Sequence, residues 1–272
     1  MRNRLVHQYF DVDYRIVWEV ASKELPNLRK EIQHSILETT PELHPWRLCP
    51  LGFYHVGPFP RNTPRGAETS VREQCKRNPS GKDQLYPPEL MRITKNHVNA
   101  FDNTSSLGTL LKFKNQSDFD REILLWVRYW NEIFQSADAL DPKYIKALIA
   151  SESSFRKRIS PKRIRRNNFA RGLLQISDQT RKILTDETGE LKDHFVTLSK
   201  KDVVVPEVAI AAAIRWLFHK KETAGKFLLR EATWEEAVAD YKGYLRLKRG
   251  LKKQNGMINI ERFFAELKRT AK

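Results

Sequence analysis

Only two cysteines occur among the 272 residues, Cys49 and Cys75. They allow one disulfide at most, and two free thiols fit the sequence equally well. Together with His44 and His55 the two cysteines could in principle bind zinc. Their spacing lacks the close ligand pairs of structural zinc sites, so no metal site is predicted. Long apolar runs are also absent. No stretch approaches the roughly 20 apolar residues of a membrane span, which predicts a chain without a transmembrane segment.

Acidic residues are fewer than basic residues. The chain has 33 aspartates and glutamates against 49 lysines and arginines, which gives a net charge of +16. A surface of this kind favours polyanions, such as nucleic acid, anionic lipid or an acidic cell wall, and the charge alone does not choose among them. A hydrophobic content of 40% and a charged content of 30% are typical of a soluble globular protein. The length allows one sizeable core, or one core with a smaller module.

Apolar residues recur at helical spacing in several parts of the chain. Helices are predicted over 14–38 (in two pieces), 88–99 and 118–136. Further helices begin at Asp141-Pro142 and at Pro206, because proline is favoured in the first turn of a helix. Thr233 and Glu236 form a capping-box pattern, which predicts another helix over the residues that follow.

Between residues 41 and 88 the helical pattern dissolves into a stretch punctuated by proline and glycine. Three aromatic residues are interleaved there, and we expect them to form a small satellite core rather than a substrate groove: Phe53, Tyr54 and Phe59. The predicted fold class is therefore mainly α. A loop-rich, partly helical N-terminal region of unknown role over 1–115 precedes a helical domain over 116–272.

The segment over 144–176 reads YIKALIASESSFRKRISPKRIRRNNFARGLLQI, and it carries the most informative pattern. Ile145, Leu148, Ile149 and Glu152 lie at i, i+3, i+4 and i+7, so one helix face carries all four side chains. Burying a carboxylate without a partner is costly. Glu152 therefore either ends the helix and points to water, or is kept partly protonated for a task.

Three short motifs lie in order around this helix: ESSF at 152–155, Ser160-Pro161, and ARGLLQI at 170–176. Their order resembles the soluble lytic transglycosylase family, in which Glu-Ser-x-aromatic, Ser-Pro and Gly-Leu-Met-Gln follow one another. The alanine-rich helix after Pro206 resembles the family too. So does AVADYKGYLRL, which is similar to the family motif Ala-x-Ala-x-Tyr-Asn.

This resemblance covers about 118–250 and implies a lysozyme-like fold that cleaves the β-1,4 bond between N-acetylmuramic acid and N-acetylglucosamine in peptidoglycan. Family members use one carboxylic acid, here Glu152, whereas ordinary glycosidases use two. The acid protonates the leaving oxygen and then takes a proton from the muramoyl 6-hydroxyl, giving a 1,6-anhydro end. An acid that starts protonated needs a raised pKa, and the apolar helix face offers a means of raising it. No metal or organic cofactor is implied.

The resemblance also implies six substrate-binding positions: Ser160, Gly172, Leu174, Gln175, Tyr241 and Lys242. Ser160 corresponds to a serine near the muramoyl group, and the residues around Gly172 to the wall of the sugar groove. Tyr241 is expected to hydrogen-bond Glu152 and to orient it. Lys242 departs from the family, which has asparagine there. Another departure is a basic insertion, because seven of the eleven residues over 156–166 are lysine or arginine. It contacts an acidic substrate or partner, or it is a solvated loop.

Three other readings remain open. The first is a non-catalytic murein-binding or structural protein that has kept the fold. The second is a nucleic-acid-binding protein driven by charge, although no DNA-reading motif is present and nucleic acid is not the expected partner. The third is a true lysozyme, in which water is the acceptor.

The N-terminal stretch, MRNRLVHQYFDVDYRIVWEV, has no uninterrupted apolar region and no small-residue cleavage site, so no secretory signal peptide is expected. An enzyme made in the cytoplasm and acting in the periplasm or cell wall then needs a dedicated route. Our hypothesis is a contractile (type VI) secretion system or a phage. A secreted toxin of this kind would have a cognate immunity protein. Oligomeric state and the choice between exo- and endo-cleavage do not follow from the sequence.

Overall fold

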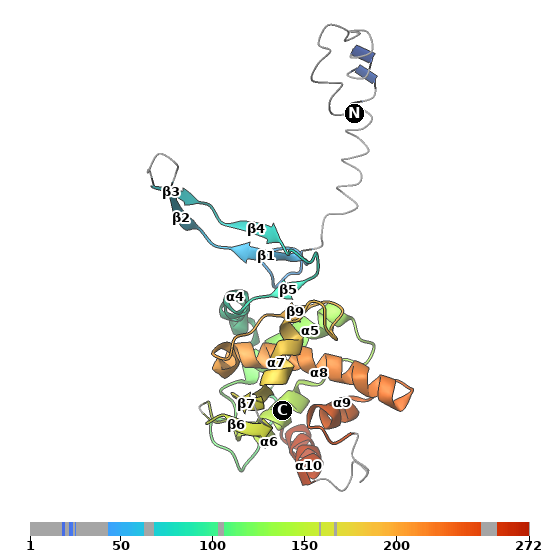
Figure 1. Ribbon diagram of the computed structural model, residues 1–272. Helices are drawn as coiled ribbons and strands as arrows, with labels where there is room; N and C mark the ends of the chain where they lie inside the picture. The colour runs from blue at the N-terminus through green and yellow to red at the C-terminus, as the bar shows by residue number, and fades with distance from the viewer. Residues whose placement is uncertain are drawn as a thin grey trace. The chain divides into compact units, whose positions relative to one another are not determined.

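The computed structural model describes residues 18–19, 22–23, 25, 43–62, 68–102, 106–157, 159–165, 168–245 and 255–271. The chain divides into two compact units, Met1–Glu42 and Leu43–Lys272. The helix predicted over 14–38 lies almost entirely outside the described residues. The second unit is mainly helical, which confirms the predicted fold class (Figure 1). The division of the chain falls at residues 42 and 43, and residue 115 lies inside the second unit.

The helices begin close to where the sequence places them. They are α4 (Pro87–His97), η2 (Val98–Phe101), α5 (Asp120–Phe134), α6 (Pro142–Ser153), α7 (Asp178–Thr185), η3 (Asp202–Val204), α8 (Pro206–Leu228), α9 (Trp234–Tyr241) and α10 (Asn255–Thr270). The helices predicted over 88–99 and 118–136 are confirmed as α4 and α5, and those predicted after Asp141 and at Pro206 as α6 and α8. None of the described helices has the length and apolar character needed to cross a membrane.

Short strands complete the second unit. They are β1 (Phe53–Val56), β2 (Phe59–Asn62), β3 (Glu68–Val71), β4 (Gln74–Arg77), β5 (Gln84–Leu85), β6 (Lys162–Arg165), β7 (Asn168–Arg171), β8 (Ile176–Ser177) and β9 (Phe195–Val196). β1 pairs with β4 and β2 with β3, both antiparallel, and β5 pairs parallel with β9. β6, β7 and β8 form an antiparallel three-stranded sheet. The loop-rich region predicted before residue 88 is thus largely a long, twisted hairpin, which extends from the helical body in Figure 1.

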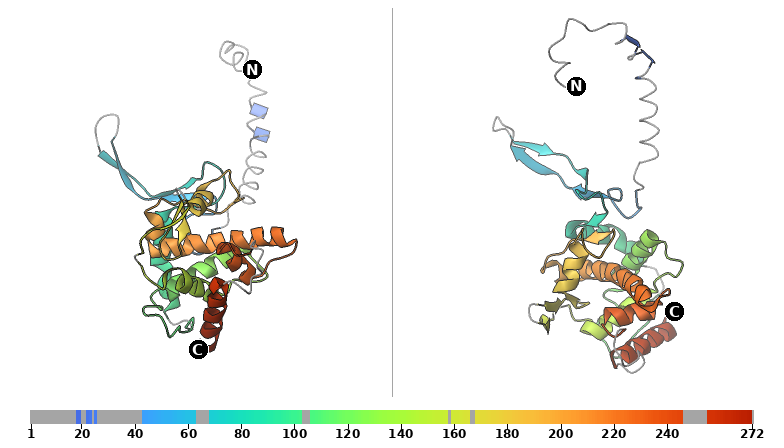
Figure 2. Two further views of the ribbon diagram at one scale, coloured as in Figure 1. Left: turned by 60° about the horizontal axis from the view of Figure 1, so that its bottom comes forward. Right: turned by 45° about the vertical axis from the view of Figure 1, so that its right-hand side comes forward.

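Helix α8 runs through the middle of the helical body in the views of Figures 1 and 2. Seven consecutive residues of its first half, Val208–Ile214, are at most 1% exposed. A helix that is apolar on all sides must be covered on all sides. The neighbouring helices α4, α5, α7 and α9 all pack against it. Alanines make up much of this stretch, and their small side chains let the covering helices approach closely.

Helix α5 contributes the aromatic part of the core. The apolar residues that recur at helical spacing over 118–136 are buried at Phe119, Ile123, Trp126 and Trp130, each at most 3% exposed, and Ile133 at the end of this stripe is partly buried. The indole N–H of Trp130 donates to the carbonyl oxygen of Ala211 in α8 at 2.9 Å, so the buried polar atom is satisfied. The apolar stripe predicted over 118–136 is confirmed. Its buried side chains and the Trp130 hydrogen bond hold α5 against α8.

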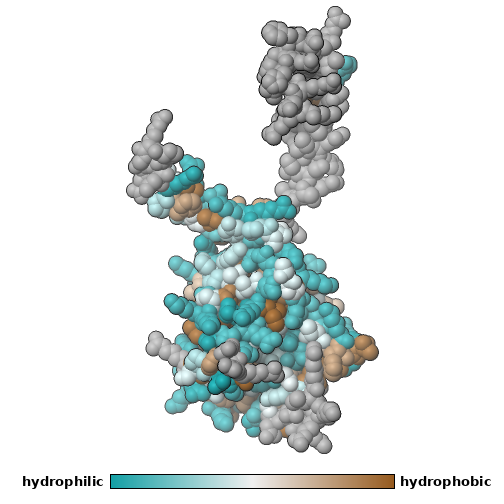
Figure 3. All heavy atoms as spheres, viewed as in Figure 1, coloured by the Kyte–Doolittle hydropathy of each residue, from teal (hydrophilic) through white to brown (hydrophobic). Residues whose placement is uncertain are grey.

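The C-terminal helix α10 covers α6. The rings of Tyr144 in α6 and Phe264 in α10 are stacked with centroids 3.9 Å apart. Gly108, in the loop before α5, packs against the backbone of Leu267 so closely that an added Cβ would lie 2.2 Å from its carbonyl oxygen. The surface facing the viewer in Figure 3 is mostly hydrophilic, with an apolar area where α8 ends and where Phe227 and Leu229 are exposed.

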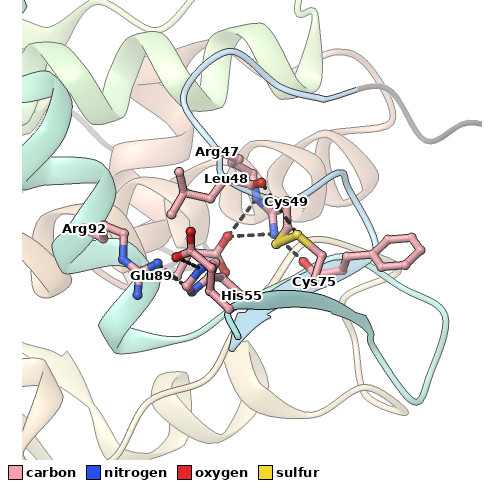
Figure 4. Close-up of a disulfide and its surroundings, with 9 residues drawn as sticks. Arg47, Leu48, Cys49, His55, Cys75, Glu89 and Arg92 are labelled. Atoms are coloured by element: carbon pink, nitrogen blue, oxygen red, sulfur yellow. Dashed lines mark hydrogen bonds and ion pairs between the residues drawn. A yellow bond between two sulfur atoms is a disulfide. The ribbon is translucent and has the colours of Figure 1, made fainter. Parts of the chain in front are cut away.

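Cys49 and Cys75 form a disulfide with 5.6 Å between their Cα atoms. It ties the segment before β1 to β4 at the base of the hairpin (Figure 4). Closing a loop of this length restricts the unfolded chain and stabilises the fold by about 3 to 4 kcal/mol in the chain-entropy model. Because both thiols are consumed, the zinc hypothesis for these two cysteines with His44 and His55 is wrong.

A buried ion network lies beside the disulfide and was not foreseen from the sequence. The guanidinium of Arg47 contacts the carboxylate of Asp83, donates to Glu89 at 3.1 Å and donates to the carbonyl oxygen of Phe53 at 2.8 Å. Figure 4 shows Arg47 and Glu89 beside the disulfide. Asp83 also contacts Nδ1 of His194 at 3.1 Å. These contacts connect the base of the hairpin to α4 and to the loop before β9.

We predict that Asp83→Asn destabilises the fold, and that the effect depends on pH. Burial raises the pKa of Asp83, but the His194 hydrogen bond and the Arg47 charge outweigh burial and lower the pKa to about 2. The carboxylate therefore contributes stability above its unfolded pKa near 4, and this contribution is lost as pH falls through about 2. At pH 7 the variant should lose roughly 3 kcal/mol, because Arg47 is left buried with one fewer anion.

Urea unfolding at pH 7, pH 4 and pH 2.5 measures this. The difference between wild type and Asp83→Asn should shrink across the acid range. Asp102→Asn is the matched control, since Asp102 pairs with Arg121 at the surface, with both side chains about half exposed, and should cost less than about 1 kcal/mol. An equal difference at all three pH values would mean that the charge of Asp83 does not stabilise the fold.

Candidate functional site

Helix α6 places Glu152 at its last turn. Asp141 caps the helix start, where its carboxylate accepts from the backbone N–H of Lys143 at 2.9 Å. Ile145, Leu148 and Ile149 are at most 1% exposed, whereas the side chain of Glu152 is 18% exposed. The predicted stripe is confirmed. It continues into a carboxylate at the edge of the core rather than inside it.

The chain turns sharply directly after this carboxylate. Ser154 and Phe155 both have left-handed backbone conformations, with φ of 52° and 61°. Such angles are uncommon outside glycine and cluster at functional sites. Phe155 is 3% exposed, and its ring packs edge-on against that of Phe113, with centroids 5.6 Å apart. The turn is therefore held in place by packing.

Helix α9 brings a lysine to Glu152. The predicted capping box is present, since the Thr233 hydroxyl accepts from the backbone N–H of Glu236 and the Glu236 carboxylate accepts from that of Thr233. The helix ends at Tyr241, and the next residue is Lys242. Its ammonium donates to Oε1 of Glu152 at 2.5 Å and to the hydroxyl of Ser151 at 2.9 Å. The lysine side chain is 10% exposed. A cation therefore contacts the carboxylate that the sequence places on an apolar face.

Tyr241 does not orient Glu152 in the way the resemblance implies. Its hydroxyl donates to the carbonyl oxygen of Leu174 at 2.8 Å, so its single proton is not available to Glu152. Burial raises the pKa of Tyr241 well above its usual value, and the charge of Glu152 raises it further. The phenol therefore stays protonated, and it ties the end of α9 to the turn over 172–175.

The turn over 172–175 depends on glycine. Gly172 has a φ of 73°, and an added Cβ would lie 2.0 Å from the carbonyl oxygen of Val203. The side-chain amide of Gln175 donates to the carbonyl oxygen of Gly172 at 2.9 Å and closes the turn. Leu174 is fully buried, so its side chain packs in the core and does not line a groove. Only its carbonyl oxygen takes part, as the acceptor for Tyr241.

Ser160 is exposed and lies beside this turn. It lines a hollow of about 480 Å³ together with Gly172, Lys157, Ile159 and Val204. The structure thus brings Ser160 next to Gly172, and separately brings Glu152 next to Lys242. A third contact is the hydrogen bond from Tyr241 to the carbonyl oxygen of Leu174. Gln175 bonds to Gly172 within the turn, so each predicted position contacts at least one other.

A second hollow, of about 630 Å³, is strongly cationic. Its lining residues are Lys112, Phe113, Lys114, Asn115, Asp118, Ser154, Phe155, Arg156 and Lys157. Four of these are lysine or arginine and one is acidic. Lys157 is 3.2 Å from Asp118, and both side chains are partly exposed. Anionic groups on a ligand would meet a favourable potential here.

The basic insertion folds as strands. Lys162–Arg165 is β6, which pairs antiparallel with β7. Lys162 and Arg163 are exposed, while Arg158 and Arg166 lie outside the described residues.

Several site residues escaped the sequence reasoning. Ser151 accepts from Lys242, and Lys112 and Lys114 line the cationic hollow. No local pattern marks them, because Ser151 meets Lys242 only when α9 packs onto α6, and Lys112 and Lys114 reach the end of α6 only when their loop folds beside it. Within the part of the chain that is described, no three or more His, Cys, Asp or Glu side chains are placed to hold a metal ion.

Comparison with known families agrees with this geometry. Residues 129–262 match the family model for the Transglycosylase SLT domain. This range contains α6, the turn over 172–175 and α9. Over this segment, slightly under half of the chain, the protein is similar to the soluble lytic transglycosylase family, and the mainly α fold described above is consistent with a lysozyme-like domain of that kind. No solved structure is significantly similar to the chain.

The N-terminal end gives a different match. Residues 1–35 match the model for Ribonuclease HepT-like. Among curated proteins, a putative RNase of Caldanaerobacter subterraneus subsp. tengcongensis is 52% identical over 33 residues, which are 12% of this chain and 30% of that protein. Two putative RNases of Methanocaldococcus jannaschii are 53% identical over 36 residues, which are 13% of this chain and 31% and 30% of theirs. The chain thus spans about a third of the length of the curated relatives it matches.

We predict that Gly172→Ala destabilises the second unit more than Gly243→Ala does. Both glycines have a φ of 73°, but an added Cβ meets a backbone oxygen at Gly172 and nothing within 4 Å at Gly243. The shared left-handed conformation should cost each variant roughly 1 kcal/mol, and the clash should add to this at Gly172 only. Thermal unfolding of the two variants measures the difference. Equal losses would show that Val203 yields to the added methyl group.

We also predict that the cationic hollow attracts murein. Lys112→Gln with Lys114→Gln should weaken sedimentation of the protein with purified peptidoglycan severalfold at about 20 mM salt and much less at about 500 mM, since salt screens exposed charges. Lys76→Gln with Lys95→Gln removes the same charge from exposed positions in β4 and α4 and serves as the control. Equal weakening by both pairs would assign the effect to net charge rather than to this hollow.

Proposed function

We propose that this chain is a peptidoglycan lytic transglycosylase in which Glu152 is the single acid and base. The family match supports action on peptidoglycan. The observation that carries the residue assignment is the place of Glu152 on the last turn of α6: Lys242 at the end of α9 contacts it, Tyr241 ties the same end of α9 to the turn over 172–175, and Ser154, two residues after Glu152, lines the cationic hollow.

The reaction follows from one carboxyl group that acts twice. Protonated Glu152 gives its proton to the oxygen that leaves with N-acetylglucosamine, and the bond from that oxygen to the muramoyl anomeric carbon breaks. The resulting carboxylate takes the proton of the muramoyl 6-hydroxyl, whose oxygen forms a new bond to the anomeric carbon. The product is a 1,6-anhydromuramoyl end. Glu152 regains its proton and no water is consumed.

Tyr241 has a positioning role in this proposal. Its hydroxyl bonds to the main chain of Leu174, so it fixes the distance between the helix that carries Lys242 and the turn that carries Gln175. Gly172 lines the hollow beside Ser160, which leaves its backbone open to a sugar ring on that side, while the absence of a side chain makes room for the backbone of Val203.

A hydrolytic lysozyme is the second candidate, because Asp118 lines the cationic hollow beside Ser154. A hydrolase needs a second carboxylate to activate water or to act as a nucleophile. Asp118 is engaged by Lys157 at 3.2 Å, which favours the single-carboxylate mechanism. Mass spectrometry of the released muropeptides separates the two, since an anhydro end is lighter than a reducing end by one water.

We predict that Glu152→Gln keeps the fold and loses nearly all lytic activity. The amide retains the shape of the side chain, but it can neither donate a proton to the leaving oxygen nor accept one from the 6-hydroxyl. Loss of a general acid and base costs roughly a hundred- to ten-thousand-fold, and a site with one such group should lie near the upper end. Release of anhydromuropeptides from purified peptidoglycan measures the rate.

Glu261→Gln is the control, because it makes the same charge change at an exposed position of α10. It should leave the rate unchanged. Circular dichroism confirms folding of both variants. A folded Glu152→Gln protein that still releases product at a near wild-type rate would show that Glu152 is an ordinary helix-end residue. A wild-type protein that binds murein without releasing product would support the non-catalytic murein-binding reading.

We further propose that the enzyme acts in the periplasm or cell wall after delivery by a dedicated secretion machine or a phage, and that a producing cell carries an immunity protein. The Cys49–Cys75 disulfide supports an oxidising destination. Expression with an added periplasmic signal should lyse a bacterial host, whereas cytoplasmic expression should not. The N-terminal likeness to ribonucleases adds no activity to this proposal, since the matched segments make up only about 30% of those proteins.

A further inference from the structure

The contact between Lys242 and Glu152 raises a problem for the reaction. The ammonium lies 2.5 Å from Oε1 of the carboxyl group that must carry a proton at the start of catalysis. An ion pair requires that Glu152 be a carboxylate. The resting arrangement and the reactive arrangement therefore exclude each other, and the family's asparagine, which is neutral, would not create this conflict.

The geometry of Lys242 allows it to leave. An ammonium has three donors, and here one is directed to Glu152 and one to the hydroxyl of Ser151 at 2.9 Å. Both charged side chains keep some exposure, 10% for Lys242 and 18% for Glu152. The lysine can thus keep Ser151 and exchange Glu152 for another anion without passing through a fully buried, unpaired state.

We propose that Lys242 is a specificity-determining residue that leaves Glu152 for a carboxylate of the bound glycan strand. Strands that present a carboxylate near the scissile bond are then the preferred substrates, because their binding releases Glu152 to take up its proton. This inference rests on the proposed function. The four cations of the neighbouring hollow fit the same class of ligand, since they favour anionic groups along the strand.

Two carboxylates of murein have this chemistry. A muramoyl residue without a peptide stem carries a free lactyl carboxylate on its ring, whereas a residue with a stem has that group converted to an amide and carries carboxylates farther out on the peptide. The ring carboxylate lies closer to the scissile bond. Comparing strands with and without stems therefore identifies the source.

The experiment uses three substrates: murein strands with stems, strands stripped of stems by an amidase, and stripped strands whose carboxyls are converted to methylamides. Wild type, Lys242→Asn and Lys242→Arg are assayed for release of anhydromuropeptides. Wild type should act roughly tenfold faster on a carboxylate-bearing strand than on the methylamide strand, the scale of one charge-assisted hydrogen bond. Lys242→Asn should lose most of this preference, and Lys242→Arg should keep it.

A wild-type enzyme that cleaves the methylamide strand as fast as both other strands would overturn the inference, and this arm needs no variant to fold. An equal preference in wild type and Lys242→Asn would overturn the inference too. So would an equal loss of rate by Lys242→Asn on all three substrates, because this result would indicate that Lys242 donates its own proton to Glu152. Failure of the proposed function has a different signature, because no anhydro product would then appear from any strand.

Discussion

The need to bury the first half of α8 on every side organises the second unit. Its residues over 208–214 are all buried, so this part of the helix has no solvent face and other elements must enclose it. Enclosure by α5 and α9 fixes the positions of the segments that meet at the site. α6 packs against both α5 and α10, and the carboxylate in its last turn, that of Glu152, keeps partial exposure. Glu152 is part-exposed because the apolar stripe of α6 ends where the covering layer ends.

Local features could be predicted from the sequence, and non-local contacts could not. The α5 and α6 stripes, the Asp141 cap and the capping box of α9 each depend on residues within two turns of one another, so periodicity and capping chemistry were sufficient. The long hairpin was missed because its strands have only four residues each, many of them polar, and lie among prolines and glycines. The Arg47 network was missed because Arg47 and its partners Asp83 and Glu89 are some 40 residues apart, and only folding brings them together.

The site was predicted in part for the same reason. Its residues came from motifs, and the structure gathers Glu152, Tyr241 and Lys242 at one end of α6. Their pairings could not be read from the motifs: Tyr241 bonds to a backbone carbonyl, and Lys242 takes the place beside Glu152 that was assigned to Tyr241. A motif specifies which residues are near one another, whereas the direction of each hydrogen bond depends on side-chain packing.

Two of the ion pairs on helix α6, those of Lys146 and Glu152, differ in burial, and this difference gives them different properties. Lys146 is fully buried and bonds Asp120 and the carbonyl oxygen of Gly108, both at 2.8 Å. Burial lowers the pKa of Lys146 and raises that of Asp120, so each depends on the other for its charge. Separating them would leave an uncompensated charge in the core, which costs several kcal/mol. The pair at Glu152 is part-exposed, so water or substrate can replace either partner. The same helix therefore holds a permanent pair in its middle and an exchangeable one at its end.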